Sequence, residues 1–74
     1  MEFDHALLVG RIKQFYKTQK MFAVAMGMND QHLSRLLNNK ADWGASDMYK
    51  AAKLLQIEEE DFVSFFLTKL VHKR

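Results

Sequence analysis

The 74-residue sequence contains no cysteine and no proline, and it has only three glycines. Without cysteine, neither disulfides nor thiolate-bound metals can brace the fold, and the chain is compatible with a reducing cytoplasm. Without proline, and with so little glycine, no segment has the composition of a flexible linker, and no internal repeat is visible. We therefore expect a single domain over residues 1–74.

Long apolar runs are also missing. No segment approaches the roughly 18 apolar residues that a membrane span needs, and the N-terminus from Met1 to His5 has no basic region before an apolar stretch. The sequence predicts a soluble, cytoplasmic protein. A domain this short buries only about 60% of its unfolded surface, so oligomerisation is the expected source of added stability.

The residue patterns of catalytic and metal sites are absent from the sequence. The sequence has no pair of carboxylates placed to share a pocket and no nucleophile beside a general base. It also has no glycine-rich loop of the kind that binds phosphate groups. The three histidines, His5, His32 and His72, are far apart in the sequence, which makes a metal site improbable without cysteine. We predict no enzymatic activity, no cofactor and no small-molecule substrate.

Charge is small in sum but uneven along the chain. The net charge is +2, from 11 basic and 9 acidic residues, which is weak support for a nucleic-acid partner. From Arg11 to Lys40, six basic residues and one acid, Asp30, give +5, while acids gather at residues 58–61. One side of the fold can be positive, although a charge run is more often simply a solvated face.

Apolar residues recur at helical spacing and predict an all-α fold of five helices. Asp4, Thr18, Asn29 and Ser46 are candidate N-caps for the first four, and the acidic run at 58–61 suits the start of a fifth ending near Leu67. Residues 68–72 alternate polar and apolar side chains. They can continue the helix or form a short strand that pairs with a second subunit.

The segment from residue 19 to 38 predicts a helix-turn-helix of the kind that reads DNA. Ala23 is small where two helices approach, and Gly27 supplies the positive φ that ends the first of them. Leu33 and Leu36 then point inward and leave a polar outer face. A recognition helix at about 30–39 would lie in the major groove.

The outer face of that helix carries the candidate base contacts. Arg35 can donate a fork of hydrogen bonds to guanine, and Gln31 can pair with adenine. Ser34 can touch a base or a phosphate, or be merely solvated. For Asp30, a contact to cytosine and plain capping of the helix carry equal weight, because a carboxylate near DNA is repelled by phosphates.

Candidate phosphate contacts lie at the two edges of this unit. They are Thr18 and Gln19 at the start of the second helix, and Asn38, Asn39 and Lys40 at the end of the third. The alternative for the two asparagines is C-terminal capping, and we expect one of them to serve that way.

Several apolar residues are assigned to the core or to an interface. We expect Trp43 to cover the core and the methionines, Met21 among them, to fill it. Exposed apolar area on the last helix indicates an interface. We predict a homodimer through the segment at about 61–74, with the interface residues Val63, Leu67, Leu70 and Val71.

Taken together, these residues resemble known phage regulators. Gln19, Phe22-Ala23, Gly27, Leu33, Arg35-Leu36 and Asn38-Asn39-Lys40 resemble the helix-turn-helix of the lambda repressor and Cro type. The whole chain is similar to a family of small phage proteins from Gram-positive hosts that share an Asn-Asn-Lys segment, a tryptophan loop and a Phe-Phe pair, here Asn38-Asn39-Lys40, Trp43 and Phe65-Phe66.

The resemblance implies a lambda-repressor-like DNA-binding domain that dimerises on palindromic, double-stranded operator DNA. It would regulate transcription in a lysis–lysogeny switch, in the cytoplasm of a bacterial host at the nucleoid. In such repressors the glutamine corresponding to Gln19 binds phosphate, and residues corresponding to Asp30, Gln31 and Arg35 read bases. Family members often have glutamine, serine or threonine in place of Asp30. No large sensor domain follows, so a Cro-like repressor fits better than a full repressor.

An alternative function is a protein-interaction module that binds another regulator, as an antirepressor does. The carboxylate of Asp30 and the low net charge favour this alternative. Salt distinguishes the two, because affinity for DNA falls steeply with salt concentration as phosphates are neutralised.

Overall fold

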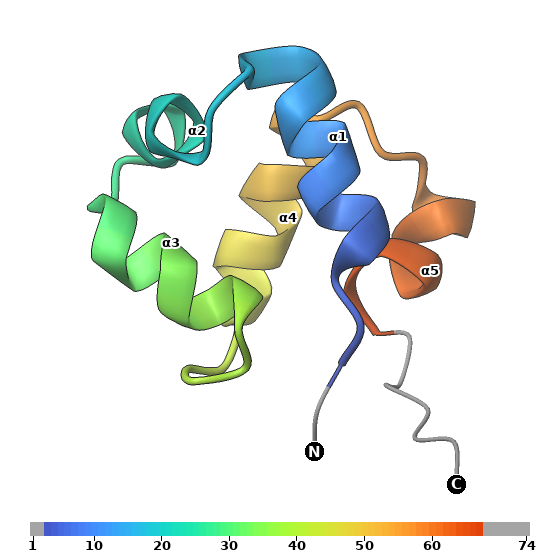
Figure 1. Cartoon of the computed structure of the whole chain (residues 1–74). Coiled ribbons are helices and arrows are strands. Elements are labelled where there is room, and N and C mark those ends of the chain that lie inside the picture. The colour runs from blue at the N-terminus through green and yellow to red at the C-terminus, as the bar shows by residue number, and fades with distance from the viewer. Residues whose placement is uncertain (1–2, 68–74) are drawn as a thin grey trace, which may run out of the picture.

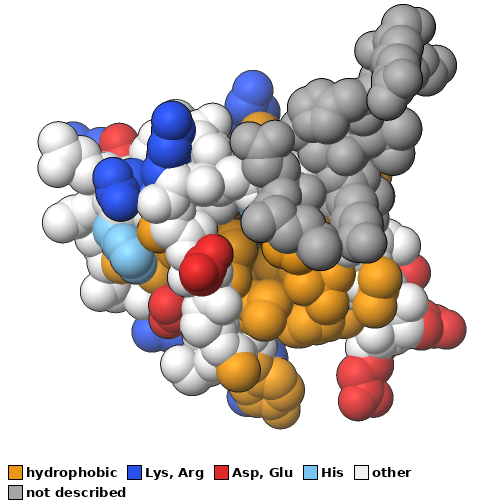
Figure 2. Space-filling view, turned by 90° about the horizontal axis from the view of Figure 1, so that it is seen from below, with side chains coloured by type: hydrophobic (Ala, Val, Ile, Leu, Met, Phe, Trp, Pro, Cys, Tyr) orange, Lys and Arg blue, Asp and Glu red, His pale blue; other side chains and the backbone are white. Residues whose placement is uncertain are grey.

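The computed structural model describes residues 3–67, which form five α-helices and one 3-10 turn (Figure 1). The elements are α1 (Ala6–Tyr16), α2 (Gln19–Met26), α3 (Asp30–Leu37), α4 (Ala45–Leu54), the 3-10 turn η1 (Glu59–Asp61) and α5 (Phe62–Phe66). The described chain begins and ends on the same side of the molecule (Figure 1). Seen from that side, hydrophobic side chains gather at the centre of the surface (Figure 2). The predicted compact all-α fold with five helices is confirmed.

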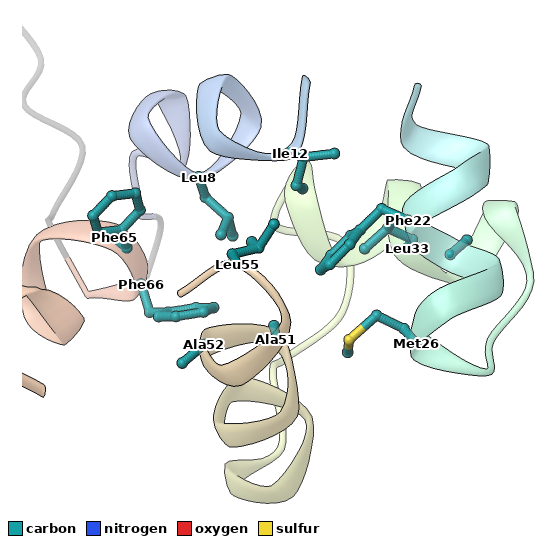
Figure 3. Packing of buried hydrophobic residues seen from close by; sticks show 11 residues of the cluster. Leu8, Ile12, Phe22, Met26, Leu33, Ala51, Ala52, Leu55, Phe65 and Phe66 are labelled. Carbon is teal, nitrogen blue, oxygen red and sulfur yellow. The ribbon is translucent and has the colours of Figure 1, made fainter. Parts of the chain in front are cut away.

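The core lies where the helices converge (Figure 3). Leu8 on α1 points toward Leu55 (Figure 3), and Leu8, Ile12, Phe22 of α2 and Leu33 of α3 are all 2% exposed or less. Residues after α3 complete the cluster, namely Ala51, Ala52, Leu55, Phe65 and Phe66. The helical periodicity of the apolar residues identified Leu8, Ile12, Phe22, Leu33 and Leu55 of the core, whereas Phe15, which shares the spacing of Leu8 and Ile12, is 39% exposed.

Local capping defines the α2–α3 unit. The Thr18 hydroxyl accepts a hydrogen bond from the Met21 amide at 3.2 Å, and the Asn29 side chain accepts one from the His32 amide at 2.7 Å. Between them, Gly27 ends α2 with φ of 75°, a left-handed conformation that glycine adopts without a Cβ clash. All three predicted roles are confirmed.

Two other helix starts differ from the prediction. Helix α4 begins at Ala45 after Gly44, so Ser46 lies inside the helix and does not cap it. At α1 the N-cap position is His5. The predicted residue, Asp4, lies one position earlier and accepts a hydrogen bond from the Ala6 amide at 2.9 Å. Its carboxylate still satisfies one of the free amides of the first turn.

The fifth helix is shorter than predicted. The acidic run does not open α5 but forms the separate turn η1, because the Asp61 amide bonds to the Glu58 carbonyl three residues back at 2.9 Å. Helix α5 then starts at Phe62. Phe65 and Phe66 are buried and Phe62 is half-buried, as predicted for residues that complete the core.

Two basic side chains connect distant elements. The Arg11 guanidinium donates to the carbonyl of Leu55 at 2.9 Å and lies 4.9 Å from the centre of the Phe65 ring. The Lys50 ammonium on α4 donates to the Met26 carbonyl at the end of α2 at 3.0 Å. A cation at a helix C-terminus satisfies a free carbonyl and interacts favourably with the helix dipole. Part of the positive charge therefore stabilises the fold.

Over residues 3–67, no helix combines the length and apolar character needed to cross a membrane. In the same part of the chain, no group of three or more histidine, cysteine or acidic residues is arranged to hold a metal ion.

Candidate functional site

The outward face of α3 brings the four predicted base-contact residues to one surface. Leu33 and Leu36 are fully buried, which turns the opposite side of the helix to solvent. Asp30, Gln31 and Arg35 are exposed there, and Ser34 is half-buried. The helix thus presents a polar row that a partner can reach along its whole length.

The first residues of α2 and α3 are joined by a side-chain hydrogen bond. The Gln19 amide nitrogen donates to the Asp30 carboxylate at 3.1 Å. Since Asn29 caps α3, Asp30 is not needed as the N-cap, and its carboxylate holds Gln19 instead. The bond leaves the carbonyl of Gln19 and the second carboxylate oxygen of Asp30 as acceptors at this corner. The corner is therefore suited to a partner that donates hydrogen bonds.

Arg35 is tied to the turn that follows α3. Its guanidinium donates to the Lys40 carbonyl at 3.0 Å, and its own carbonyl accepts from the amides of Lys40 and Ala41 at 2.8 and 3.2 Å. A guanidinium has five N–H donors, and the Arg35 side chain is exposed. Arg35 can thus contact a partner while its position stays fixed by the turn.

The two asparagines after α3 have different structural roles. Asn38 is the C-cap, and its side-chain amide donates to the Ser34 carbonyl at 2.8 Å. Asn39 has φ of 62° and exchanges two hydrogen bonds with the backbone of Phe3: the Phe3 amide donates to it at 3.0 Å, and it donates to the Phe3 carbonyl at 2.9 Å. The expectation that one asparagine acts as a cap is confirmed. The other holds the N-terminal segment against the turn after α3.

The outer side of α2 carries two exposed apolar side chains that the sequence pattern did not predict to be part of a site. Met21 is 54% exposed and Val24 is 74% exposed. They are three residues apart, so they lie on one face of the helix. The prediction that Met21 fills the core is wrong, since Phe22, Ala23 and Met26 occupy the buried face. The signal was a run of six apolar residues in a helix that can bury only one side.

The remaining predicted residues fall outside this surface or at its margin. His32, Thr18 and Lys40 are exposed. Trp43 is half-buried and packs edge-on against Phe66, with ring centroids 5.3 Å apart. The expectation that Trp43 covers the core is confirmed.

Two of the four predicted dimer-interface residues lie within the described chain. Val63 is 61% exposed and Leu67 is 40% exposed, both on or directly after α5. The other two, Leu70 and Val71, lie outside the described residues. The homodimer stays a prediction, with two exposed apolar residues available to it.

Comparisons with known proteins give a family and a structural relative. A family model described as "Protein of unknown function (DUF739)" matches residues 1–69. The chain is similar to the solution structure of the modulator of repression (MOR) of the temperate bacteriophage TP901-1 from Lactococcus lactis. The two are 33% identical, with a TM-score of 0.81 and 97% of each chain covered. No curated protein matches the chain.

Proposed function

This chain belongs to the DUF739 family, and on that premise we propose that it modulates repression in a phage by binding another regulatory protein through the outer surface of α2 and α3. The structural relative is a phage modulator of repression and is similar over almost its entire length, which supports a regulatory role.

The observation that carries the proposal is the exposed pair Met21 and Val24 on α2. When a regulator docks a recognition helix in the major groove, the preceding helix crosses the phosphate backbone. Apolar side chains gain nothing from phosphates there. Against a protein surface, full burial of one aliphatic side chain is worth about 1.5–3 kcal/mol. Exposed apolar area beside a polar rim is typical of a protein–protein contact.

The corner between α2 and α3 supports the same interpretation. The Asp30 carboxylate at the start of α3 is exposed and would face phosphates in a DNA complex, which costs electrostatic free energy. One N–H of the Gln19 amide, the group that would donate to a phosphate, is bonded to that carboxylate, which leaves its second N–H as the donor for a partner. A protein partner can instead supply a lysine or arginine to this acceptor-rich corner.

The test is binding to the repressor of the same phage, measured by isothermal titration calorimetry with the full-length chain. Val24→Asp should weaken binding about 10-fold or more, because it places a charge in the apolar contact. Leu7→Asp is the matched control, since Leu7 is a 57% exposed aliphatic residue on α1, and it should bind like the wild type. Absence of binding by the wild-type protein would refute the proposal.

Direct binding to double-stranded DNA is a second candidate, favoured by the polar outer face of α3. Gln31 and Arg35 are both exposed on it, and they can pair with adenine and guanine in the major groove. In this case the protein acts as a Cro-like homodimer on a palindromic operator. The bond to the Lys40 carbonyl uses one of the five N–H donors of Arg35, so the others stay available for a base contact.

Fluorescence anisotropy with random duplex DNA at about 50 and 200 mM salt tests this candidate. DNA binding predicts a slope of log affinity against log salt of about −0.9 per phosphate contacted. The substitutions Arg35→Ala and Lys40→Ala should both weaken DNA binding. If the protein is folded and shows no salt-dependent binding to DNA, the DNA-binding candidate is refuted and the protein-interaction function remains.

A further inference from the structure

One methionine lies exposed on the surface that is proposed to bind the partner. Among the methionines of residues 3–67, Met21 on α2 is 54% exposed, whereas Met26 is 4% exposed and belongs to the core. Met28 and Met48 are half-buried and pack against that core. An oxidant has to reach the sulfur atom before it can react, so Met21 is the methionine of this part of the chain that should be oxidised first.

The surroundings of Met21 make this position sensitive to a change of polarity. Val24, which is 74% exposed, lies three residues further along α2 and therefore on the same face. In the proposed complex the two side chains are buried together against the partner. A thioether suits such a contact because it is apolar and adapts its shape. A polar atom introduced at Met21 would have to give up its water on binding, which costs free energy.

We propose that Met21 is a modification site, at which reversible oxidation by a peroxide switches off binding of the regulatory partner. The inference rests on the function proposed above, and it names the regulation of that same surface. In the oxidation, a lone pair of the Met21 sulfur attacks one oxygen of hydrogen peroxide, so that an S–O bond forms and the O–O bond breaks. The sulfur loses two electrons and becomes a sulfoxide. The second peroxide oxygen leaves as water with both protons.

The sulfoxide changes the property on which the contact depends. It is polar and chiral, whereas the thioether is a flexible apolar group. In the free protein the new oxygen at Met21 points into water, and the buried sulfur of Met26 is protected, so the fold should be retained. In the complex the same oxygen lies between apolar side chains. Since methionine sulfoxide reductases convert the sulfoxide back to the thioether, the switch is reversible.

Mass spectrometry of the individual methionines tests the site. The full-length protein is treated with hydrogen peroxide, and samples are digested and analysed at successive times. The sulfoxide should form at Met21 several-fold faster than at Met26, Met28 or Met48. An equal or slower rate at Met21 would overturn the proposal, whatever the protein binds.

Isothermal titration calorimetry with the repressor of the same phage tests the switch. The protein is oxidised alone, and the peroxide is removed before the repressor is added, so that the repressor is not modified. Oxidation should weaken binding about 10-fold or more, as expected when a buried polar group lacks a partner. Treatment with the two methionine sulfoxide reductases and a dithiol should restore the affinity. A loss of affinity accompanied by a loss of helical circular dichroism would show unfolding and overturn the proposal.

Two matched variants assign the effect to one sulfur atom, and each is compared with itself before and after peroxide treatment. Met21→Leu removes the thioether and keeps an apolar side chain, so its affinity should not respond to peroxide. Met48→Leu makes the same replacement on α4 and should lose affinity on oxidation as the wild type does. A peroxide response that persists in Met21→Leu would overturn the proposal.

The outcomes for the wild-type protein separate this inference from the function on which it rests. Normal binding of the oxidised protein would overturn the inference alone. A reduced protein that does not bind the repressor would overturn the proposed function and the inference with it.

Discussion

The side chain of Gln19 donates a hydrogen bond to the carboxylate of Asp30 across 3.1 Å and so joins the first residues of α2 and α3. Both residues were expected at a nucleic-acid interface, one on phosphate and one on a base. Their contact with each other gives this corner of the molecule a net negative, acceptor-rich character.

Replacing Asp30 should change binding more than stability. The Asp30 side chain is exposed, and Asp30→Asn keeps an oxygen that can accept from Gln19, so the free energy of unfolding should change by less than about 0.5 kcal/mol. Loss of the negative charge should raise affinity for random duplex DNA at low salt and lower affinity for a basic protein partner. Anisotropy and calorimetry measure the two effects. A variant that binds DNA more weakly than the wild type would contradict this account of the carboxylate.

Asn39 should contribute to stability through its two bonds to Phe3. Asn39→Ala removes both bonds and places alanine at φ of 62°, and we expect a loss of about 1–3 kcal/mol in the free energy of unfolding. Asn39→Gly removes the same bonds but adopts the positive φ without strain. Urea denaturation of the two variants separates the hydrogen bonds from the backbone conformation. Equal stability of both variants and the wild type would refute the role.

Lys50 should stabilise the fold more than Lys53, although both are exposed lysines on α4. Lys50→Met removes the bond to the Met26 carbonyl at the end of α2. A hydrogen bond that involves a charged group contributes about 1.5–3 kcal/mol to stability. Because the ammonium is partly solvated, we expect a loss of about 1 kcal/mol. Lys53→Met is the control: its ammonium lies 5.6 Å from the centre of the exposed Tyr49 ring, so we expect a smaller loss, of about 0.5 kcal/mol. A thermal melt that ranks the two variants in the opposite order would show that the contact does not contribute.

The predicted homodimer can be tested by sedimentation at high micromolar protein concentration. Val63→Asp should shift the equilibrium toward the monomer, because Val63 is 61% exposed on α5 and a charge there would be buried in the interface. The control is Tyr49→Asp, which places the same charge at a 66% exposed position on α4 and should sediment like the wild type. A wild-type protein that sediments as a monomer would refute the dimer.

The sequence by itself determined the features that depend on neighbouring residues. Thr18, Gly27 and Asn29 act within one helical turn of their own position, so their chemistry could be interpreted without the fold. The buried face of α3, with Leu33 and Leu36, followed from the period of the helix, because a helix with one apolar stripe has only one way to bury it. These local rules fixed the helices and most of the core.

Only the tertiary structure decided how side chains distant in sequence are used. The bonds of Asn39 to Phe3 and of Lys50 to Met26 span 36 and 24 residues, and no local rule assigns them. The same holds for Met21, because residues 21–26 of α2 are apolar on every side of the helix, and the packing partners alone select Phe22 and Met26 for the core. A hollow lined by His5, Trp43, Met48 and Phe66, among others, likewise forms only because four separate segments of the chain meet there. Periodicity shows which faces of a helix can be buried, whereas the choice between equivalent faces requires the neighbouring helices.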